Sequence, residues 1–233
     1  MKVLALDLGE QRVGYALGDT RVGFVNRTGF VKVAELSSFL ESNPADLVLV
    51  GLPVSLNGRF SHAVERTVRQ IERQVAPHVK RIAMIDERYT SKMVEQRMKP
   101  QDRRRKGRID ALSAFTILEE YLRGTPKIWW YRENLALEKL KLRSIFTKIL
   151  VWELPLIVEC ESDARNVEVF YFASHPQVFV ELKRLGKKVT NREEDLVKRA
   201  PFELAICEEP LKIGLEFQEV MAVRGGIHPR ERG

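Results

Sequence analysis

The chain has 233 residues, of which 44% are hydrophobic and 30% charged, and its formal net charge is +7. This length suits one large domain or two small ones, and the composition allows a real hydrophobic core. No apolar run approaches the roughly 20 residues that span a bilayer. Asp7 also interrupts the first apolar stretch too early for a signal peptide, so we expect a cytoplasmic protein without membrane contact.

The basic surplus lies in the first half of the sequence. Residues 1–124 hold 21 lysines and arginines against 15 acids, a net charge of +6. Residues 125–233 hold 18 against 17, a net charge of +1. A basic surplus of this kind indicates a polyanionic partner, such as nucleic acid, for the first half.

The first half predicts a mixed α/β sheet of five strands with flanking helices. Apolar stretches separated by short turns predict three antiparallel strands, and later segments alternate between helical spacing and continuous apolar runs. The expected strands are 3–7, 13–17, 22–28, 46–51 and 82–85, and the expected helices are 33–41, 61–76, 91–98 and 111–122. Residues 99–108 (KPQDRRRKGR) predict an irregular basic arm, and the Gly-Thr-Pro sequence at 124–126 ends the first domain at residue 124.

Residues 125–233 predict a second, small α/β domain. We expect an amphipathic helix at 134–148, strands at 156–160, 167–172 and 202–207, and a helix at 178–185. The aromatic sequence at 129–131 (WWY) could stack on nucleic-acid bases, but packing against the second domain is favoured. Nothing in this half indicates its role.

Three acidic residues occupy positions where a charge is costly. Asp7 ends the first strand, Glu87 ends the fifth, and Asp110 starts the last helix of the first domain. Neighbouring carboxylates repel, so such a cluster needs a neutralising partner. Oxygen ligands without histidine or cysteine suit Mg²⁺ or Mn²⁺, and a pair of these ions supports phosphodiester cleavage. Each acid also has an ordinary explanation, in a hairpin turn, an ion pair with Arg88 or the first turn of a helix.

Four sequence motifs lie along the first half of the chain, and three of them contain these acids. The pattern DxGxxxxGxAxG is present at 7–18, GLPxxxxG at 51–58, DERxTS at 86–91 and KGxxDxxxAxxIL at 106–118. In order and spacing they resemble the YqgF/RuvX family of ribonuclease H-like nucleases, which are called Holliday junction resolvases and pre-16S rRNA nucleases. The family pattern ends near residue 124, so the resemblance covers about half of the chain.

The resemblance implies roles for individual residues. Asp7 is expected to be the central metal ligand, and Glu87 and Asp110 are expected to complete a catalytic Mg²⁺ or Mn²⁺ site. Asp86 is less suited, because successive strand residues face opposite sides of a sheet. Gly9 and Gly14 are expected to let the hairpin approach the nucleic-acid backbone. The residues expected to bind nucleic acid are Arg12, Arg59, Arg88, Arg103, Arg104, Arg105, Lys106 and Arg108.

The main hypothesis is a metal-dependent endonuclease of structured nucleic acid, acting on the 5′ end of pre-16S rRNA, with RNA favoured over DNA. One alternative is a Holliday junction resolvase, which would act on DNA as a dimer. Another is a catalytically silent RNA-binding factor of ribosome assembly. An actin-like sugar or acetate kinase also begins with a DxG strand, but the sequence lacks the further phosphate and adenosine motifs. Residues 125–233 are expected to support a homodimer or to contact a ribosome-assembly partner.

Overall fold

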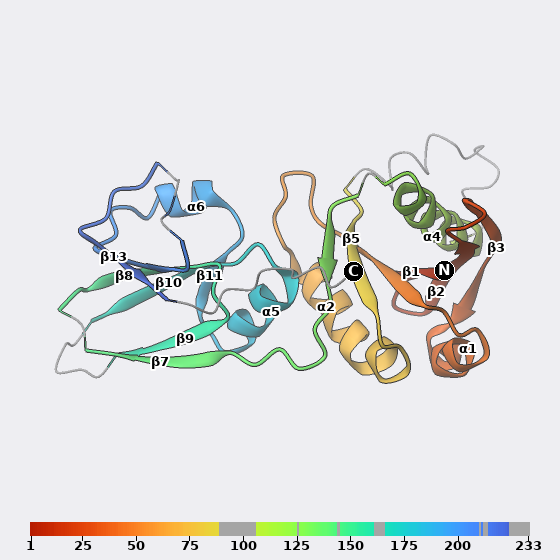
Figure 1. The fold of residues 1–233 in the computed structure, drawn as a ribbon, viewed down its shortest axis with the longest axis horizontal. Helices are drawn as coiled ribbons and strands as arrows, with labels where there is room; N and C mark the ends of the chain where they lie inside the picture. Colours follow the sequence, from red (N-terminus) through yellow and green to blue (C-terminus); the bar gives the residue numbers. More distant parts are fainter. Residues whose placement is uncertain are drawn as a thin grey trace. The chain divides into compact units, whose positions relative to one another are not determined.

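The computed structural model describes residues 1–88, 106–124, 126–143, 145–160, 166–209, 211 and 214–223, without the side chains of 106–108. The chain divides into two compact units, Met1–Glu133 and Asn134–Gly233. Figure 1 shows their elements in sequence colours. The first unit extends past the predicted boundary at residue 124, and whether residues 125–233 act as a separate domain stays a prediction.

The first unit is built on a sheet of six strands in the order β3-β2-β1-β4-β5-β6. The first three strands pair antiparallel, β1, β4 and β5 pair parallel, and β6 runs antiparallel to β5. Their bounds are β1 Lys2–Leu8, β2 Arg12–Asp19, β3 Phe24–Lys32, β4 Leu47–Leu52, β5 Ile82–Asp86 and β6 Ile128–Trp130. The mixed sheet is confirmed, but the prediction of five strands is wrong by one.

The sixth strand is made by the aromatic sequence that we expected to pack against a second domain. Trp129 is only 7% exposed, and its ring lies edge-on to Phe60 with 5.9 Å between centroids. The strand is short and follows a turn at Gly124, so its pairing depends on a tertiary contact with β5 rather than on a local pattern. These side chains therefore belong to the first sheet.

The helices of the first unit lie on both faces of this sheet, with α4 on one side and α1 and α2 on the other (Figure 1). Ser61 caps α2, because its hydroxyl accepts a hydrogen bond from the amide of Ala63 at 3.2 Å. The bounds are η1 Val33–Glu35, α1 Leu36–Ser42, α2 His62–Gln70, η2 Ile71–Val75, η3 Ala76–His78 and α4 Lys106–Leu122. The helix expected at 91–98 lies outside the described residues.

The end of the basic arm is helical. We expected irregular structure through residue 108 and a helix from about 111, whereas α4 already begins at Lys106. Lysine and arginine are good helix formers, and Gly107 is the only strong breaker after the proline at 100. Asp110 consequently lies within the helix rather than at its start.

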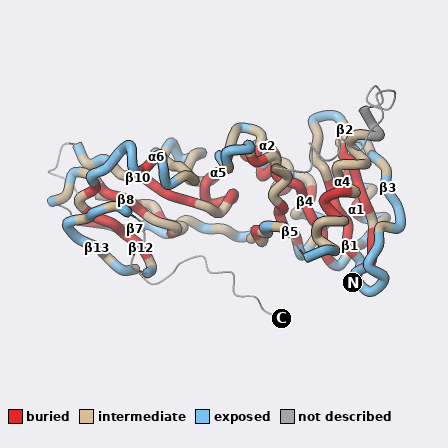
Figure 2. The backbone as a smooth tube through the Cα atoms, turned by 90° about the horizontal axis from the view of Figure 1, so that it is seen from above, coloured by how far each residue is buried: buried red, intermediate tan, exposed pale blue. Residues whose placement is uncertain are grey.

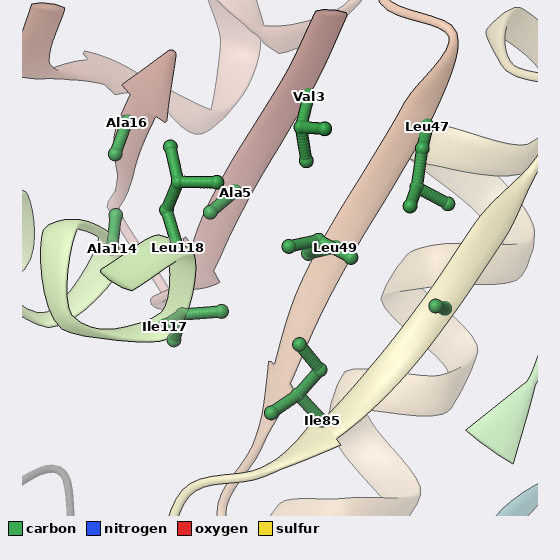
Figure 3. Packing of buried hydrophobic residues seen from close by; sticks show 10 residues of the cluster. Val3, Ala5, Ala16, Leu47, Leu49, Ile85, Ala114, Ile117 and Leu118 are labelled. Atoms are coloured by element: carbon green, nitrogen blue, oxygen red, sulfur yellow. The ribbon is translucent and has the colours of Figure 1, made fainter. Parts of the chain in front are cut away.

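The core under α4 follows the alternation of the strands. Figure 3 shows this cluster, in which helix residues meet side chains from neighbouring strands. Its buried members are Val3, Ala5, Ala16, Leu47, Leu49, Ala83, Ile85, Ala114, Ile117 and Leu118. Because strand side chains alternate between faces, continuing these series places Asp7, Gly14, Gly51 and Glu87 on the same side of the sheet as α4.

The second unit contains a parallel sheet of five strands in the order β11-β10-β8-β12-β13, and a separate parallel pair of β7 and β9. The bounds are β7 Glu138–Leu142, β8 Lys148–Trp152, β9 Leu156–Cys160, β10 Glu168–Phe172, α5 Pro176–Arg184, β11 Lys188–Thr190, α6 Glu193–Val197, β12 Leu204–Cys207 and β13 Glu219–Ala222. The predicted strands at 156–160, 167–172 and 202–207 and the helix at 178–185 all have counterparts. No described helix of the chain is long and apolar enough to cross a membrane.

The helix predicted at 134–148 is wrong. In its place β7 pairs with β9, and β8 begins at Lys148. Leu140 and Leu142 fit a strand that alternates with Lys139 and Lys141, and the burial of β7 follows this alternation over its last three residues. Apolar spacing in so short a segment is compatible with either element, and the ladder with β9 decides between them.

Candidate active site

Asp7 lies near the end of β1, directly opposite Gly14 of β2. On the same strand face, Val3 and Ala5 belong to the core under α4. Asp7 therefore follows the apolar cluster on the same face of the strand, and it is the first acidic side chain beyond the core. The position agrees with the prediction that the first strand ends at this acid.

Gly14 brings Asp110 to this place. A Cβ added to Gly14 would lie only 1.9 Å from the backbone oxygen of Asp110, a distance that no side chain tolerates. The missing side chain therefore lets α4 rest directly on β2. This differs from the expected role of Gly14 in admitting nucleic acid, because the space above it is filled by the helix. Gly9 likewise faces its own turn, where a Cβ would lie 2.5 Å from the carbonyl oxygen of Arg12.

Gly51 does the same for Glu87. Glu87 follows β5, and its amide donates a hydrogen bond to the Leu52 carbonyl of β4 at 3.1 Å. A Cβ on Gly51 would lie 1.7 Å from Oε1 of Glu87, so the carboxylate lies over the bare backbone of β4. Oε1 is buried and has no hydrogen-bond partner among the described residues. Such an atom is costly unless a cation or a proton satisfies it.

The three predicted acids influence one another electrostatically. Burial and, after it, the charge of Asp110 raise the pKa of Asp7 to about 6, while a hydrogen bond from Ser113 opposes the rise. Burial also raises the pKa of Glu87 well above its usual range, and the charges of Asp7, Glu120 and Asp86 add to this effect. Glu87, Asp7 and Asp110 thus form a row of carboxylates across β5, β1 and α4.

Two members of this neighbourhood were not predicted from the sequence. Ser113 lies one turn after Asp110 on α4 and hydrogen-bonds Asp7. Glu120 lies further along α4, and burial followed by the charge of Asp86 raises its pKa. The i+3 spacing from Asp110 could have indicated Ser113, whereas Glu120 is next to the row only through the packing of α4 on the sheet.

Asp86, next to Glu87 in the sequence, is paired with an arginine. Its carboxylate forms an ion pair with Arg88 at 2.7 Å and accepts a hydrogen bond from the Arg88 amide at 3.0 Å. Its charge nevertheless acts on Glu87 and Glu120. Arg88 is thereby held beside the acids, and its guanidinium lies 3.3 Å from a Cβ built on Gly58 of the loop after β4.

The other residues expected to bind nucleic acid are distributed as follows. Arg12 lies on β2 with its Nε 3.8 Å from Oδ2 of Asp110, so it borders the carboxylates. Arg59 is exposed at the end of a tight turn in which Ser55 Oγ donates to Asn57 Oδ1 at 2.6 Å. Arg103, Arg104 and Arg105 lie outside the described residues. Lys106 and Arg108 lie in the first turn of α4, and their side chains are not described.

The donor set fits a hard divalent cation in its chemistry. It consists of carboxylate oxygens, one of them buried without a partner in the described part of the chain, and burial with neighbouring charges raises the pKa values of Asp7 and Glu87. Within the described residues, no group of three or more histidine, cysteine, aspartate or glutamate side chains is close enough to hold a metal ion as it stands. A cation would therefore have to draw the members of the row toward one another.

Comparison with known proteins gives the class of this chain, a nuclease, and then its family. The family model RuvX, described as Holliday junction resolvase, matches residues 1–124. The chain belongs to the RuvX family. Residues 125–233 lie outside this match.

Relatives of known name agree with this assignment. A Thermus thermophilus protein named "Putative pre-16S rRNA nuclease" is 32% identical over 132 residues, which are 52% of this chain and 97% of the relative. A Bacteroides thetaiotaomicron protein of the same name is 31% identical, over 52% of this chain and 95% of the relative. The similarity is thus to nearly the whole of these shorter proteins.

Two solved structures are also similar. One is the Fowlpox virus resolvase with its substrate Holliday junction DNA, at 12% identity, a TM-score of 0.39 and coverage of 53% of this chain and 98% of that chain. The other is Thermus thermophilus RuvC, at 14% identity, a TM-score of 0.35 and coverage of 55% and 100%.

Proposed function

We propose that this protein is a metal-dependent endonuclease of structured RNA that processes the 5′ end of pre-16S rRNA. The observation that carries the proposal is the carboxylate row, in which Glu87 keeps a buried oxygen without a partner among the described residues, beside Asp7. The names of the similar Thermus and Bacteroides proteins support the choice of RNA substrate.

Asp7, Glu87 and Asp110 would hold Mg²⁺ or Mn²⁺. When bound, such ions activate water and stabilise the leaving oxygen in phosphodiester hydrolysis. The chain itself positions these carboxyl groups and sets the pH at which they lose their protons. Because the pKa of Glu87 is raised, its carboxyl keeps a proton to a higher pH than an exposed glutamate does, until a cation competes for the site. Arg12 beside Asp110, and Arg88 beside Asp86, are placed to bind substrate phosphates.

A second candidate is a Holliday junction resolvase, because the matching family model carries that description. Both substrates present bent phosphodiester backbones to the same acids, so a direct comparison is needed. A third outcome is RNA binding without cleavage, which would indicate an assembly factor.

The test is cleavage of a pre-16S rRNA fragment and a matched four-way DNA junction by one preparation, with Mg²⁺ or with EDTA. We expect cleavage of the RNA in Mg²⁺ and none in EDTA, and no cleavage by the Asp7→Asn variant. Specific, symmetrical cutting of the junction with intact RNA would favour the resolvase. Full activity of Asp7→Asn would rule out the proposed site.

A further inference from the structure

One aromatic side chain on the edge of the first sheet shares its face with the carboxylate row. Phe30 of β3 is paired with Gly14 of β2, which in turn is paired with Asp7 of β1. Directly opposed residues of antiparallel strands point to the same side of a sheet. Phe30 and Asp7 therefore face the same way, two strand spacings or about 10 Å apart.

The Phe30 side chain is 49% exposed, so its ring is open to a ligand. Figure 2 shows β3 as a largely exposed strand at the edge of a buried sheet. Its neighbour Tyr15, which faces the opposite side, is buried and packs on Phe39 of α1 with 4.6 Å between ring centroids. The sheet thus covers one aromatic residue and leaves the other open.

Arg12 connects Phe30 to the acids. Its guanidinium carbon lies 5.6 Å from the centroid of the Phe30 ring, within the range of a cation–π contact. The same side chain reaches Asp110 at 3.8 Å. An aromatic ring, a guanidinium and a carboxylate are therefore consecutive neighbours on one face, with exposed Lys32 paired opposite Arg12 on the edge strand.

We propose that Phe30 is a stacking platform for one unpaired nucleobase of the substrate, with Arg12 binding the adjacent phosphate. This inference rests on the proposed nuclease function and deepens it, because it makes a locally unpaired strand the preferred substrate. Phe30 lies about 10 Å from Asp7, two strand spacings away. The platform would hold the strand a few nucleotides from the bond to be cut.

The chemistry of the surroundings favours a nucleobase over a second protein chain as the occupant. Base stacking on an exposed aromatic residue, with arginine beside it, is how proteins commonly bind single strands without sequence preference. Residues 1–124 also carry the net charge of +6, which attracts a polyanion and repels a second copy of the same surface.

The test measures binding without cleavage, in EDTA, with a fluorescent single-stranded RNA of mixed sequence and with an abasic version of equal length. Phe30→Ala should weaken binding of the intact strand by about 5- to 100-fold, which is the usual effect of losing one stacked base. It should have little effect on the abasic strand. Phe30→Trp should retain the affinity, and its added fluorescence should be quenched by the intact strand.

Phe24→Ala is the matched control. Phe24 is on the same strand and is 57% exposed, but it pairs with Asp19 at the other end of β3, about 20 Å from Phe30. The Phe24→Ala protein should bind the intact and the abasic RNA with the affinity of the unchanged protein. Equal affinity of Phe30→Ala and the unchanged protein for the intact strand would overturn the platform, as would a change of oligomeric state as the only effect. The binding assay contains no divalent metal and does not depend on cleavage. The stacking proposal can therefore be judged even if the protein does not cleave RNA.

Discussion

Asp7 and Glu87 lower the stability of the folded protein when their carboxyl groups are charged. Glu87 lies over the bare backbone of Gly51, Asp7 lies opposite Gly14, and both acids carry a raised pKa. A pKa moved from 3.8 to about 6 corresponds to about 3 kcal/mol at neutral pH. Selection for folding alone would replace such a residue, which is why the pair points to chemistry.

The sign of this cost gives a prediction for stability. A carboxyl group whose pKa is raised on folding stabilises the protein below its unfolded pKa and loses that contribution as pH rises through the folded value. For Asp7 this window runs from about 3.8 to about 6. In EDTA at pH 7, the free energy of unfolding of Asp7→Asn should exceed that of the unchanged protein by up to about 3 kcal/mol. The variant should therefore unfold at a higher temperature.

The two proteins should have nearly equal stability at pH 4, where Asp7 is largely protonated in the folded state and about half protonated in the unfolded state. Thermal unfolding monitored by circular dichroism at both pH values measures the difference. Mg²⁺ at pH 7 should stabilise the unchanged protein more than the variant, by mass action. A variant that is less stable at pH 7 would contradict the burial cost and the repulsion on which this prediction depends.

Gly14 and Gly51 allow a second comparison. Gly14→Ala would meet the backbone of Asp110, which cannot turn away, whereas Gly51→Ala would meet the far end of the Glu87 side chain. We expect Gly14→Ala to lose about 1–3 kcal/mol of stability together with activity. Gly51→Ala should lose activity with a smaller loss of stability, because Glu87 can rotate.

Denaturant unfolding and cleavage rates of both variants test this contrast. Gly214→Ala is the control, since a Cβ there meets nothing within 4 Å. If Gly51→Ala cleaved RNA at the normal rate, the position of the Glu87 carboxylate would not matter for the reaction.

The sequence predicted the positions of Asp7 and Glu87 because each follows an apolar run that can only be a buried strand. It misplaced Asp110 relative to the helix start, because a dense basic run resembles an irregular segment. The role of Gly14 could not be predicted, since the contact that explains it joins β2 to a helix almost 100 residues later. Local patterns identify the candidate acids, and long-range packing determines how they meet.

At the scale of elements, the strands of the first sheet were predictable where hydrophobic runs were long and continuous. The errors include β6 and β7, which are short and whose partners are distant in sequence or come later in the chain. The sequence also predicted no strand at β8, β11 or β13 and no helix at α6. Intrinsic preference has little weight in such segments, and strand pairing decides. Because β6 lies at the end of the first unit, a fragment that is a few residues too short loses a whole strand of the sheet.

A fragment that ends at residue 124 lacks β6 and leaves β5 as an open edge. It also removes Trp129 from its contact with Phe60. We expect the 1–124 fragment to be less stable than a 1–133 fragment by about 3–5 kcal/mol, the usual cost of losing a buried tryptophan, and to aggregate through the free edge. Gel filtration and thermal unfolding compare the two. Equal stability would show that β6 is dispensable.

At the scale of the whole molecule, charge separates the two halves of the sequence. The surplus of +6 in residues 1–124 against +1 in residues 125–233 predicts that phosphate binding belongs to the first unit. We infer that the second unit adjusts substrate or partner choice. The 1–133 fragment should therefore cleave a simple RNA in Mg²⁺ and bind it with the salt dependence of the full chain.

The measurement is the slope of log affinity against log salt concentration for both proteins. The slopes should agree within one phosphate contact, which is worth about 0.7 on single strands. A slope shallower by several contacts would place the phosphate-binding surface partly in the second unit. A folded 1–133 fragment that bound RNA in EDTA but did not cleave it in Mg²⁺ would mean that residues 134–233 supply a necessary group.

The place of β6 in the chain also has a consequence for biosynthesis. The first sheet receives its last strand at Ile128–Trp130, before any described strand of the parallel sheet has been synthesised. In that sheet β12 enters between β8 and β13, and β13 is the last strand in the described part of the chain. Domains generally fold in the order of their synthesis, and parallel sheets form slowly because their contacts are distant in sequence. On a translating ribosome, the nascent chain can thus complete the unit that carries the carboxylate row while the second unit is still being made.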